Sequence, residues 1–512
     1  MPSLFSPIAA NQFGPYQAAH LLWRAGFGCT WSEAERVAKL GLKAAVESLV
    51  NLAPEASSGV PESVQVPPGP SERAYQQALQ NLADGPRRAE REKQETEKLN
   101  ELRFWWLNRM LSTKRPLEEK MTLFWHSHFA SAYGDKIRTS YALWQQNELF
   151  RKHALGSFEE LTQNVMRDPT MLVWLDNAQN VRGKANENLA RELMELFTLD
   201  VGHYTEMDVK ESARALTGNH MERENWTFVF NEAAHDPDPK TFLGKTGNFK
   251  AEDIVKIICE QPACPRFITR KLLEFFVYEN PEPALLDEAA ALFRQQGMHI
   301  GKFLGILFQS QLFYLSPKAY GSVVKSPVVL TVGALKSFRV PVPEKNMLID
   351  ALRLMGQDLF LPPDVNGWPG GMAWINSNML LIRYNFANFL LNGVSPDQFK
   401  TFKKETAGSA LKRREFVEAQ RSAKPINWSP RQQLTNLGLE RRFATGADIV
   451  DHYIREFIGR PVSKELRAQF VAFSETDATG GRKSFSLADS NFDERVRGLV
   501  HLIMSSPDFQ LC

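Results

Sequence analysis

Two histidine side chains, His126 and His128, lie in the mostly apolar segment KMTLFWHSHFASAYGDKI. Imidazole is a frequent metal ligand and a frequent general acid or base, because its ordinary pKa lies close to neutral pH. Residues two apart point to different sides of a helix, so both rings could reach one metal ion only where the helix ends or the chain is extended. The segment therefore indicates either a metal or catalytic site, or two hydrogen-bonded histidines that cap or bridge helices.

Three carboxylates form a second group, in the segment NENLARELMELFTLDVGHYTEMDVKESARALTGN. Glu192 and Glu195 share one face of a predicted helix, and Glu211 belongs to the next helix, after a short connection. Helices joined in this way pack as an antiparallel pair, so we expect the carboxylates to lie close together. Carboxylates on facing helices, completed by histidine, bind divalent metals in helical proteins. The predicted metal ligands are His126, His128, Glu192, Glu195 and Glu211.

An ion-pair network is the alternative explanation of the same segment. Arg191 and Arg214 are spaced so that they could neutralise the three acids, and such networks fix the register of helices without any ligand. If a metal binds, iron or manganese suits a mixed nitrogen and oxygen ligand set better than zinc, because no thiolate accompanies these residues. The metal could then activate water for hydrolysis or support an oxidation, and the residues do not decide between the two.

A histidine–aspartate pair, His235 and Asp236, lies in the proline-rich stretch AAHDPDPKTFLGKTG. A loop can place such a pair over a site, as metal ligands or as a base with its orienting group. A turn stabilised by aspartate side chains is the alternative. Together with the acidic helix, this pair completes the set of residues that we expect to carry catalysis: Glu195, Arg191, His235 and Asp236.

Two tryptophans, Trp368 and Trp374, flank a Pro-Gly-Gly turn in the segment LPPDVNGWPGGMAWINSNMLLIRY, and Arg383 follows them. Tryptophans beside glycine can wall a small-molecule pocket. They can also pin a loop onto the core of the protein. We favour this second interpretation.

The elements that carry these residues are predicted to be helices. Apolar residues recur at helical spacing in most of the chain, and Thr30 with Glu33 forms a capping box ahead of one such run. We find no alternation of strands and helices and no internal repeat. The predicted fold is all-α, a multi-helix globular protein with long loops and at most a minor β-hairpin around residues 226–230 and 241–243.

The chain is predicted to divide into five segments, because its 512 residues exceed the size at which a single core stops growing. An N-terminal helical unit takes residues 1–53, and a linker with a charged helix takes residues 54–102. The main helical core with the candidate site spans 103–400. A basic insertion poor in aliphatic residues spans 401–445, and a C-terminal helical unit spans 446–512.

Charge and composition argue against several classes of protein. Sixty-one basic and 59 acidic side chains leave a formal net charge of +2, so no overall field draws the protein to nucleic acid or to an anionic membrane. Cys259 and Cys264 are expected to be small buried residues, with a local disulfide as the alternative. No apolar run is long enough to cross a membrane, and the first residues lack the features of a signal peptide. We therefore expect a cytoplasmic protein without membrane insertion.

Six segments together resemble the bacterial family of domains of unknown function numbered 1800: LLWRAGFGCT, FWHSHF, NENLARELMELFTLDVGHYTEMDVKESARALTG, HDPDPKTFLG, PPDVNGWPGGMAW and RGLVHLIMSSPDFQ. The resemblance covers nearly the whole chain. It implies a helical protein that is often exported to the periplasm and is frequently encoded beside a sulfatase-like partner. This chain departs from the family in lacking an export signal and in carrying Phe197 where several members carry histidine. The resemblance supplies no catalytic residues.

Three functions follow from these patterns. The one we favour is a metal-dependent enzyme, a hydrolase or an oxidoreductase, with a histidine and carboxylate site between helices. The alternative is a non-enzymatic helical scaffold, or a partner of a sulfatase-like protein, in which the acids and arginines are structural. Nucleic-acid binding through the basic stretch 403–442 is least favoured, because such a stretch is usually a solvated insertion.

Overall fold

The protein consists mostly of packed helices, in a computed structural model that describes residues 3–51, 57–66, 85–392, 426–439, 443, 445–476, 481 and 486–512. The α-helices are α1 (Pro15–Arg24), α2 (Trp31–Leu40), α3 (Leu42–Val50), α5 (Gly85–Ser112), α6 (Pro116–His128), α7 (Ser140–Lys152), α8 (Phe158–Val165), α9 (Pro169–Trp174), α10 (Asn188–Glu192), α11 (Glu206–Ala215), α12 (Ala251–Glu260), α13 (Ala263–Phe276), α14 (Pro283–Gln295), α15 (Ile300–Leu307), α16 (Gln311–Leu315), α17 (Pro327–Phe338), α18 (Lys345–Leu354), α19 (Ser377–Asn392), α22 (Pro430–Asn436), α23 (Gly446–Phe457), α24 (Lys464–Ser474), α25 (Phe492–Met504) and α26 (Pro507–Gln510).

Short helical turns and two strand pairs complete the described structure. The turns are η1 (Ala10–Gln12), η2 (Glu62–Val64), η3 (Asn177–Gln179), η5 (Glu232–Ala234), η6 (Gly371–Ile375) and the π-helix η4 (Leu193–Thr198). The strands are β1 (Asn219–Glu222), β2 (Thr227–Phe230), β3 (Lys240–Phe242) and β4 (Lys245–Gly247). The predicted all-α fold is confirmed.

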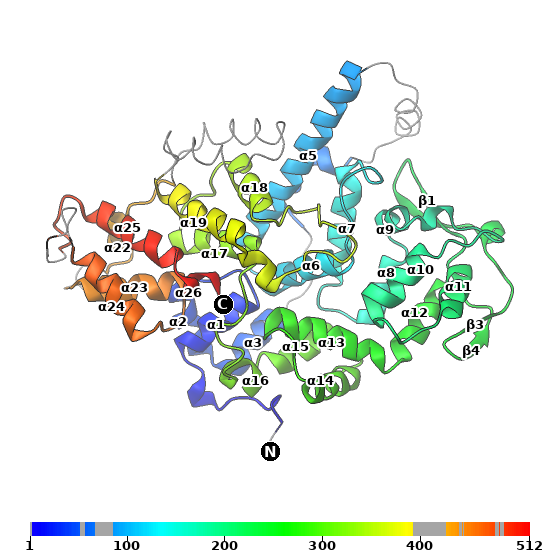
Figure 1. Ribbon diagram of the computed structural model, residues 1–512, viewed down its shortest axis with the longest axis horizontal. Helices are drawn as coiled ribbons and strands as arrows, with labels where there is room; N and C mark the ends of the chain where they lie inside the picture. Colours follow the sequence, from blue (N-terminus) through cyan, green and yellow to red (C-terminus); the bar gives the residue numbers. More distant parts are fainter. Residues whose placement is uncertain are drawn as a thin grey trace.

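The helices α22–α26 lie at one end of the molecule, and α8–α12 with both strand pairs lie at the other (Figure 1). Helix α6 lies between these two ends and packs against α3, α5 and α7. The end of the chain returns to the middle of the molecule, where the amide of Lys325 donates a hydrogen bond to the carbonyl of Gln510 (2.8 Å). Buried apolar side chains form a cluster that extends from Phe5 to Cys512.

Helix α6 is the element that matters most for the site, because it is buried on nearly every side. It begins with Pro116 at its first position, where a missing amide costs nothing, and all its side chains from Leu117 to His126 are buried. A helix that is buried all round lies at the centre of a globular protein rather than on its surface. The polar residues of α6 are therefore held inside the molecule.

Helix α5 confirms a prediction made from charge pattern alone. Its N-terminal part, rich in alternating charges, is mostly exposed where it is described, and the same helix continues into the buried residues Leu102, Trp106 and Met110. The predicted capping box at Thr30 is also confirmed, and Thr205 begins α11 in the same way, since each threonine accepts a hydrogen bond from the amide three residues on.

The strands differ from the prediction of one minor hairpin. Residues 227–230 pair with 219–222, and residues 240–242 pair with 245–247, so each predicted strand belongs to a separate antiparallel hairpin with its own sequence neighbour. A two-residue turn, Leu243–Gly244, with positive φ at both residues closes the second hairpin. Local turn geometry thus decides the pairing.

Two predicted segments lie wholly or partly outside the described residues. These are the linker within 54–102 and the basic insertion at 401–445, of which residues 426–439, 443 and 445 are described. No helix among the described residues is both long enough and apolar enough to cross a membrane.

Candidate functional site

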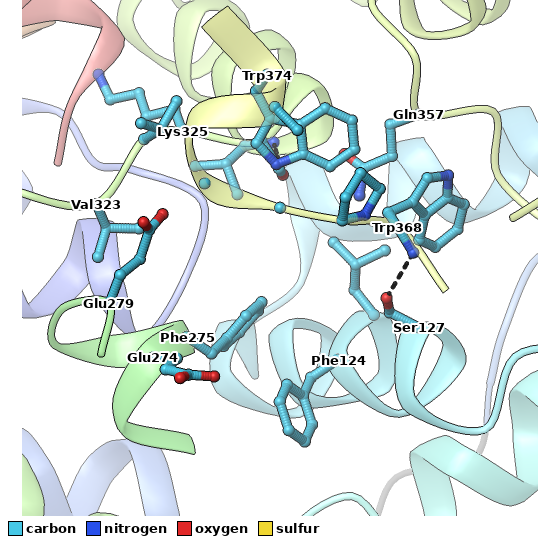
Figure 2. Close-up of a pocket in the computed structure, with 18 of the residues that line it drawn as sticks. Phe124, Ser127, Glu274, Phe275, Glu279, Val323, Lys325, Gln357, Trp368 and Trp374 are labelled. Carbon is cyan, nitrogen blue, oxygen red and sulfur yellow. Dashed lines mark hydrogen bonds between the residues drawn. The ribbon is translucent and has the colours of Figure 1, made fainter. Parts of the chain in front are cut away.

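A cavity of about 640 Å³ opens between α6, α13, the segment before α17 and the loop that carries the two tryptophans (Figure 2). Phe124 and Phe275 lie on one side of this cavity, and Trp368 and Trp374 lie across from them. Its volume falls within the range of pockets that enclose small organic molecules. We call this space the central cavity.

One face of α6 lines the central cavity. The residues that α6 contributes to the lining are Lys120 and four residues that follow it by three, four, seven and eight positions: Leu123, Phe124, Ser127 and His128. Residues at these intervals share one face of an α-helix. The histidine segment thus contributes to a cavity, and so does Lys120, about two turns before His128 on the same helix face.

The tryptophan loop is fixed to the end of α6 by a close backbone contact. The amide of Trp368 donates a hydrogen bond to Oγ of Ser127 (3.2 Å), and both Trp368 and Trp374 are buried. Gly367, with a φ of 80°, lies directly against the carbonyl of Ser127. Both interpretations of this segment are therefore correct, because the loop is pinned to the core and also forms a wall of the cavity.

Replacing Gly367 with alanine should displace this wall. A Cβ atom at Gly367 would lie 2.0 Å from the carbonyl oxygen of Ser127, and the left-handed backbone already disfavours a side chain. We expect the free energy of unfolding, measured by urea denaturation, to fall by about 2 to 4 kcal/mol.

Gly370→Ala is the matched control for this change. Gly370 also has a positive φ, of 71°, but no atom lies near the position of its Cβ. Only the penalty of its backbone conformation (φ 71°, ψ −173°), about 1 to 3 kcal/mol, should then apply, so the loss should be smaller than for Gly367→Ala. Equal losses in the two variants would show that the contact between Gly367 and Ser127 does not hold the loop.

Two buried cations, Lys120 and Arg24, stand at one end of the central cavity. Neither forms an ion pair with any described acidic residue, and the guanidinium of Arg24 instead donates to the carbonyl oxygens of Phe276, Val277 and Ala319. Burial lowers the pKa of Lys120 to about 8; a negative charge at Cys512 opposes this shift and the charge of Arg24 adds to it. An amine in this state exchanges protons near neutral pH.

A third buried cation, Lys325, lies just before α17. Its Nζ is 3.7 Å from the ring centre of Trp23 and 4.3 Å from that of Phe509, and it has no hydrogen-bond partner. Burial lowers the pKa of Lys325 to about 7. Figure 2 shows its side chain pointing away from Trp368 and Trp374, so this amine is enclosed by aromatic rings rather than open to the cavity.

His128 connects the central cavity to the acidic segment, although through the backbone. Its Nε2 donates to the carbonyl oxygen of Phe197 (3.0 Å), and its Nδ1 has no hydrogen-bond partner. Burial lowers the pKa of His128, and the nearby charge of Lys271 acts in the same direction. His128 is therefore a neutral imidazole. Phe197 lies in the π-helix η4, an irregularity that is frequent at functional sites.

His126 faces a different partner, as helical geometry requires. Its Nε2 accepts a hydrogen bond from the amide of Phe360 (3.1 Å), and its ring lies between Trp106 and Trp368. Burial lowers the pKa of His126 to about 3. It is a neutral structural histidine that orients the chain near Phe360, and it does not share a partner with His128.

The two acids of the predicted helix lie near each other but are partly exposed. Tyr204 donates a hydrogen bond from its hydroxyl to Glu195 (2.9 Å). Burial raises the pKa of Glu192, and the charge of Glu195 raises it further. Arg191, expected to join them, instead pairs with Glu206 (2.8 Å). The pair is a small acidic cluster on the surface side of this helix.

Glu211 belongs to a separate cluster that Arg214 organises. Arg214 donates to Glu211 (3.0 Å) and to Asp236 (2.8 Å), and Glu211 also accepts from the amide of Thr241 (3.0 Å). His235 bonds through Nδ1 to the carbonyl oxygen of Thr217 (2.8 Å). The side-chain bond from Arg214 lowers the pKa of Asp236 despite its partial burial. The predicted His–Asp pair thus ties a loop to α11.

The predicted metal ligands are therefore not brought together. The described residues contain no group of three or more histidine, cysteine, aspartate or glutamate side chains arranged to hold a metal ion. The physical reason is that each histidine bonds to a different backbone group through Nε2, while Arg214 neutralises Glu211. The ion-pair alternative describes Glu211 correctly. Asp236 accepts a hydrogen bond from the amide of Asp238 (3.0 Å), as in the predicted turn stabilised by aspartate side chains. The four cysteines are free and buried, which confirms the expectation for Cys259 and Cys264.

The sequence interpretation overlooked Lys120, Arg24 and Lys325. Lys120 has a detectable signal, since it shares a helix face with Leu123, Phe124 and Ser127, although Glu118 and Glu119 directly precede it. A lysine on a mostly apolar helix face is rarely buried without a partner, which makes its position informative. Nothing in the spacing shows that Arg24 joins it.

Comparison with known proteins adds the family of the chain. No curated protein and no solved structure matches it. The family model described as protein of unknown function (DUF1800) matches residues 20–511, which is nearly the whole chain. The chain therefore belongs to the DUF1800 family.

Proposed function

We propose that the central cavity binds a small organic acid. Its carboxylate would lie near Lys120 and Arg24, and its apolar or aromatic part would lie between the aromatic walls. The observation that carries this proposal is that both cations are buried at the cavity and neither pairs with a carboxylate in the described part of the chain.

The energetic argument begins with the cost of burying charge. A cation removed from water loses several kcal/mol of hydration, and only a partner of opposite charge or good hydrogen bonds restores it. The carbonyl groups of Phe276, Val277 and Ala319 do this for Arg24. Among the described residues, the amine of Lys120 has the faces of Phe27 and Phe275 nearby and feels a negative charge at Cys512, but it forms no ion pair or hydrogen bond. An anionic ligand would supply the missing charge. Perturbed lysines in a cavity are also typical of functional sites.

The walls of the central cavity favour an apolar body on the ligand. Phe124, Phe275, Trp368 and Trp374 offer rings on opposite sides, and aromatic groups contact such rings favourably. Glu274 and Glu279, which also line the central cavity, would repel a second negative group. A monoanion with one apolar or aromatic substituent therefore fits better than a dianion.

Isothermal titration calorimetry with 3-phenylpropionate and its neutral amide tests this proposal. The acid should bind, and the amide should bind at least about tenfold more weakly, because it cannot pair with a cation. Lys120→Met should weaken the binding of the acid by a similar factor. Lys114→Met is the matched control, since Lys114 is exposed and lies outside the central cavity.

Two results would contradict the proposal. One is equal affinity for the acid and the amide, which would show that charge plays no part in binding. The other is undiminished affinity of Lys120→Met in a protein that is still folded by circular dichroism. Failure of the wild-type protein to bind any of a series of small monocarboxylates would count in the same way.

A divalent metal and a sulfatase-like partner both stay predictions. Glu195→Gln tests the metal, because a glutamine can still accept the bond from Tyr204 but is a poor metal ligand. We expect unchanged metal content by elemental analysis and a change in the free energy of unfolding below about 1 kcal/mol. A lower metal content in the variant would instead support Glu195 as a ligand.

A further inference from the structure

The amine of Lys120 is unusual in having neither a hydrogen bond nor an ion pair within the described chain. Its Nζ lies 5.3 Å from the ring centre of Phe27 and 5.5 Å from that of Phe275. The residue is 4% exposed, yet it belongs to the lining of the central cavity. An amine with no internal partner that borders a cavity is free to react with a molecule inside it.

The other lysines near the cavity are placed differently. The Nζ of Lys325 is enclosed between Trp23 and Phe509 and points away from the tryptophan walls. Lys271 also lines the central cavity, with its Nζ over the ring of Phe267; burial lowers its pKa, and the charge of Glu274 opposes this shift. Of the three, Lys120 is the one whose amine is neither enclosed by aromatic rings, as that of Lys325 is, nor close to a glutamate, as that of Lys271 is.

We propose that Lys120 is a nucleophile that condenses with the carbonyl group of an oxo acid bound in the central cavity. This inference rests on the proposed function, because the same cations must hold the carboxylate of the substrate. Lysine becomes a nucleophile in proteins when an apolar pocket or an adjacent cation keeps a fraction of it unprotonated. Both conditions hold for Lys120, with the phenylalanine rings around it and Arg24 beside it.

The reaction balances without any oxidant or further reactant. The lone pair of the neutral amine forms a bond to the carbonyl carbon, and the carbonyl oxygen takes up a proton as the amine loses one. Loss of this oxygen as water then breaks the C–O bond and leaves a C=N bond between Lys120 and the substrate. One amine and one carbonyl group thus give one imine and one molecule of water, and the step is reversible.

The substrate class follows from the groups around Lys120. The carbonyl provides the atom that the amine attacks, and a carboxylate on the adjacent carbon would face the charge of Arg24, which backbone carbonyls hold in place. An aromatic or branched substituent would lie between the phenylalanine and tryptophan walls. A 2-oxo acid with one apolar substituent has all three parts.

Reductive trapping of the wild-type protein with phenylpyruvate and sodium cyanoborohydride tests this inference. Reduction fixes the imine as a stable amine, so intact mass should increase by the oxo acid plus two hydrogens minus water. Peptide mapping should place this single adduct on Lys120. The rate of trapping should rise with pH up to about 8, since burial lowers the pKa of this amine to about 8. Excess 3-phenylpropionate, which has no carbonyl, should prevent labelling.

Variants and outcomes separate this inference from the proposed function. Lys120→Met should give no adduct, while Lys114→Met should be labelled like the wild type. Labelling spread over exposed lysines, or found on Lys271 or Lys325 instead, would overturn the role of Lys120. If 3-phenylpropionate binds by calorimetry but phenylpyruvate forms no adduct, the nucleophile is wrong and the proposed function stands. If neither compound binds, both fail. Peptide mapping of the labelled wild-type protein identifies the reactive lysine even if Lys120→Met does not fold.

Discussion

Replacing Glu119 with leucine should lower the free energy of unfolding by about 3 to 5 kcal/mol. Glu119 is completely buried and accepts hydrogen bonds from Trp106 (2.9 Å), Arg109 and Arg151 (2.8 Å). Burial alone would raise the pKa of Glu119, but the charge of Arg151 and its hydrogen bonds, with those of Arg109, hold it below its ordinary value. Loss of the carboxylate would leave Arg151 buried, with only Glu148 and Asn147 as partners. Urea denaturation followed by circular dichroism measures the change.

A double-mutant cycle distinguishes this ion-pair network from simple packing. Arg151→Met should by itself be destabilising, because it leaves Glu119 with one cation fewer. The variant with both changes should lose clearly less stability than the sum of the two single losses, since no buried charge is then left without its partner. Additive losses would mean that the pair contributes through packing alone.

This network also bears on the site, because Glu119 precedes Lys120 in α6. Its bonds reach Trp106 in α5 and Arg151 in α7, so they fix the rotation of α6 about its axis. That rotation directs Lys120 and Phe124 toward the central cavity. A destabilised Glu119 variant that still folds should therefore also bind 3-phenylpropionate more weakly than the wild type.

The helical fold could be predicted because its signals are local. The capping boxes at Thr30 and Thr205 mark helix starts through bonds within four residues, and apolar periodicity marks the faces. The hairpins were harder to predict, because strands of three or four residues are too short to show a clear alternation of apolar and polar residues. The turn that directly follows a strand decides its pairing partner, and in both β1–β2 and β3–β4 this partner is the next strand in the sequence. The spacing between strands that lie far apart in the sequence does not reveal this pairing.

The candidate site was harder still to predict, because the spacing of residues along the chain does not show which partner each side chain will contact. The sequence correctly predicts that α10 and α11 are neighbours, yet Glu211 turns to Arg214 and Thr241 rather than to Glu195. The two histidines lie two residues apart and, as helical geometry predicts, face different partners. Each imidazole bonds to a backbone group through Nε2, whereas Nδ1 of His128 has no hydrogen-bond partner among the described residues.

The cations of the central cavity come from three segments far apart in the sequence. Arg24 lies at the end of α1, Lys120 within α6 and Lys325 just before α17. Arg24 and Lys325 each stand alone in an apolar run, whereas Lys120 follows two glutamates, and only the tertiary fold places the three cations together. A buried charge that lacks an acidic partner is costly, so a lone cation in an apolar run is an informative feature of a sequence.

Lys325→Met should raise the free energy of unfolding at pH 6.5 by about 2 to 3 kcal/mol. Burial lowers the pKa of Lys325 from 10.5 to about 7, which corresponds to roughly 4 to 5 kcal/mol against the charged form in the folded state. The cation–π contacts with Trp23 and Phe509 offset about 1 to 2 kcal/mol of this, and methionine fills a similar volume. The comparison is made by urea denaturation of the wild type and the variant.

The pH dependence of this stabilisation gives the prediction its sharpest form. Below pH 7 the lysine is charged in both states, so the folded wild-type protein bears the full cost of the buried charge. Between pH 7 and 10.5 the unfolded chain binds a proton that the folded protein has lost, so the stability of the wild type rises with pH. The advantage of Lys325→Met should therefore shrink steadily from pH 6.5 to pH 10. The exposed control Lys114→Met should show no such trend, and a constant difference for Lys325→Met would mean that its amine is not buried as a charge.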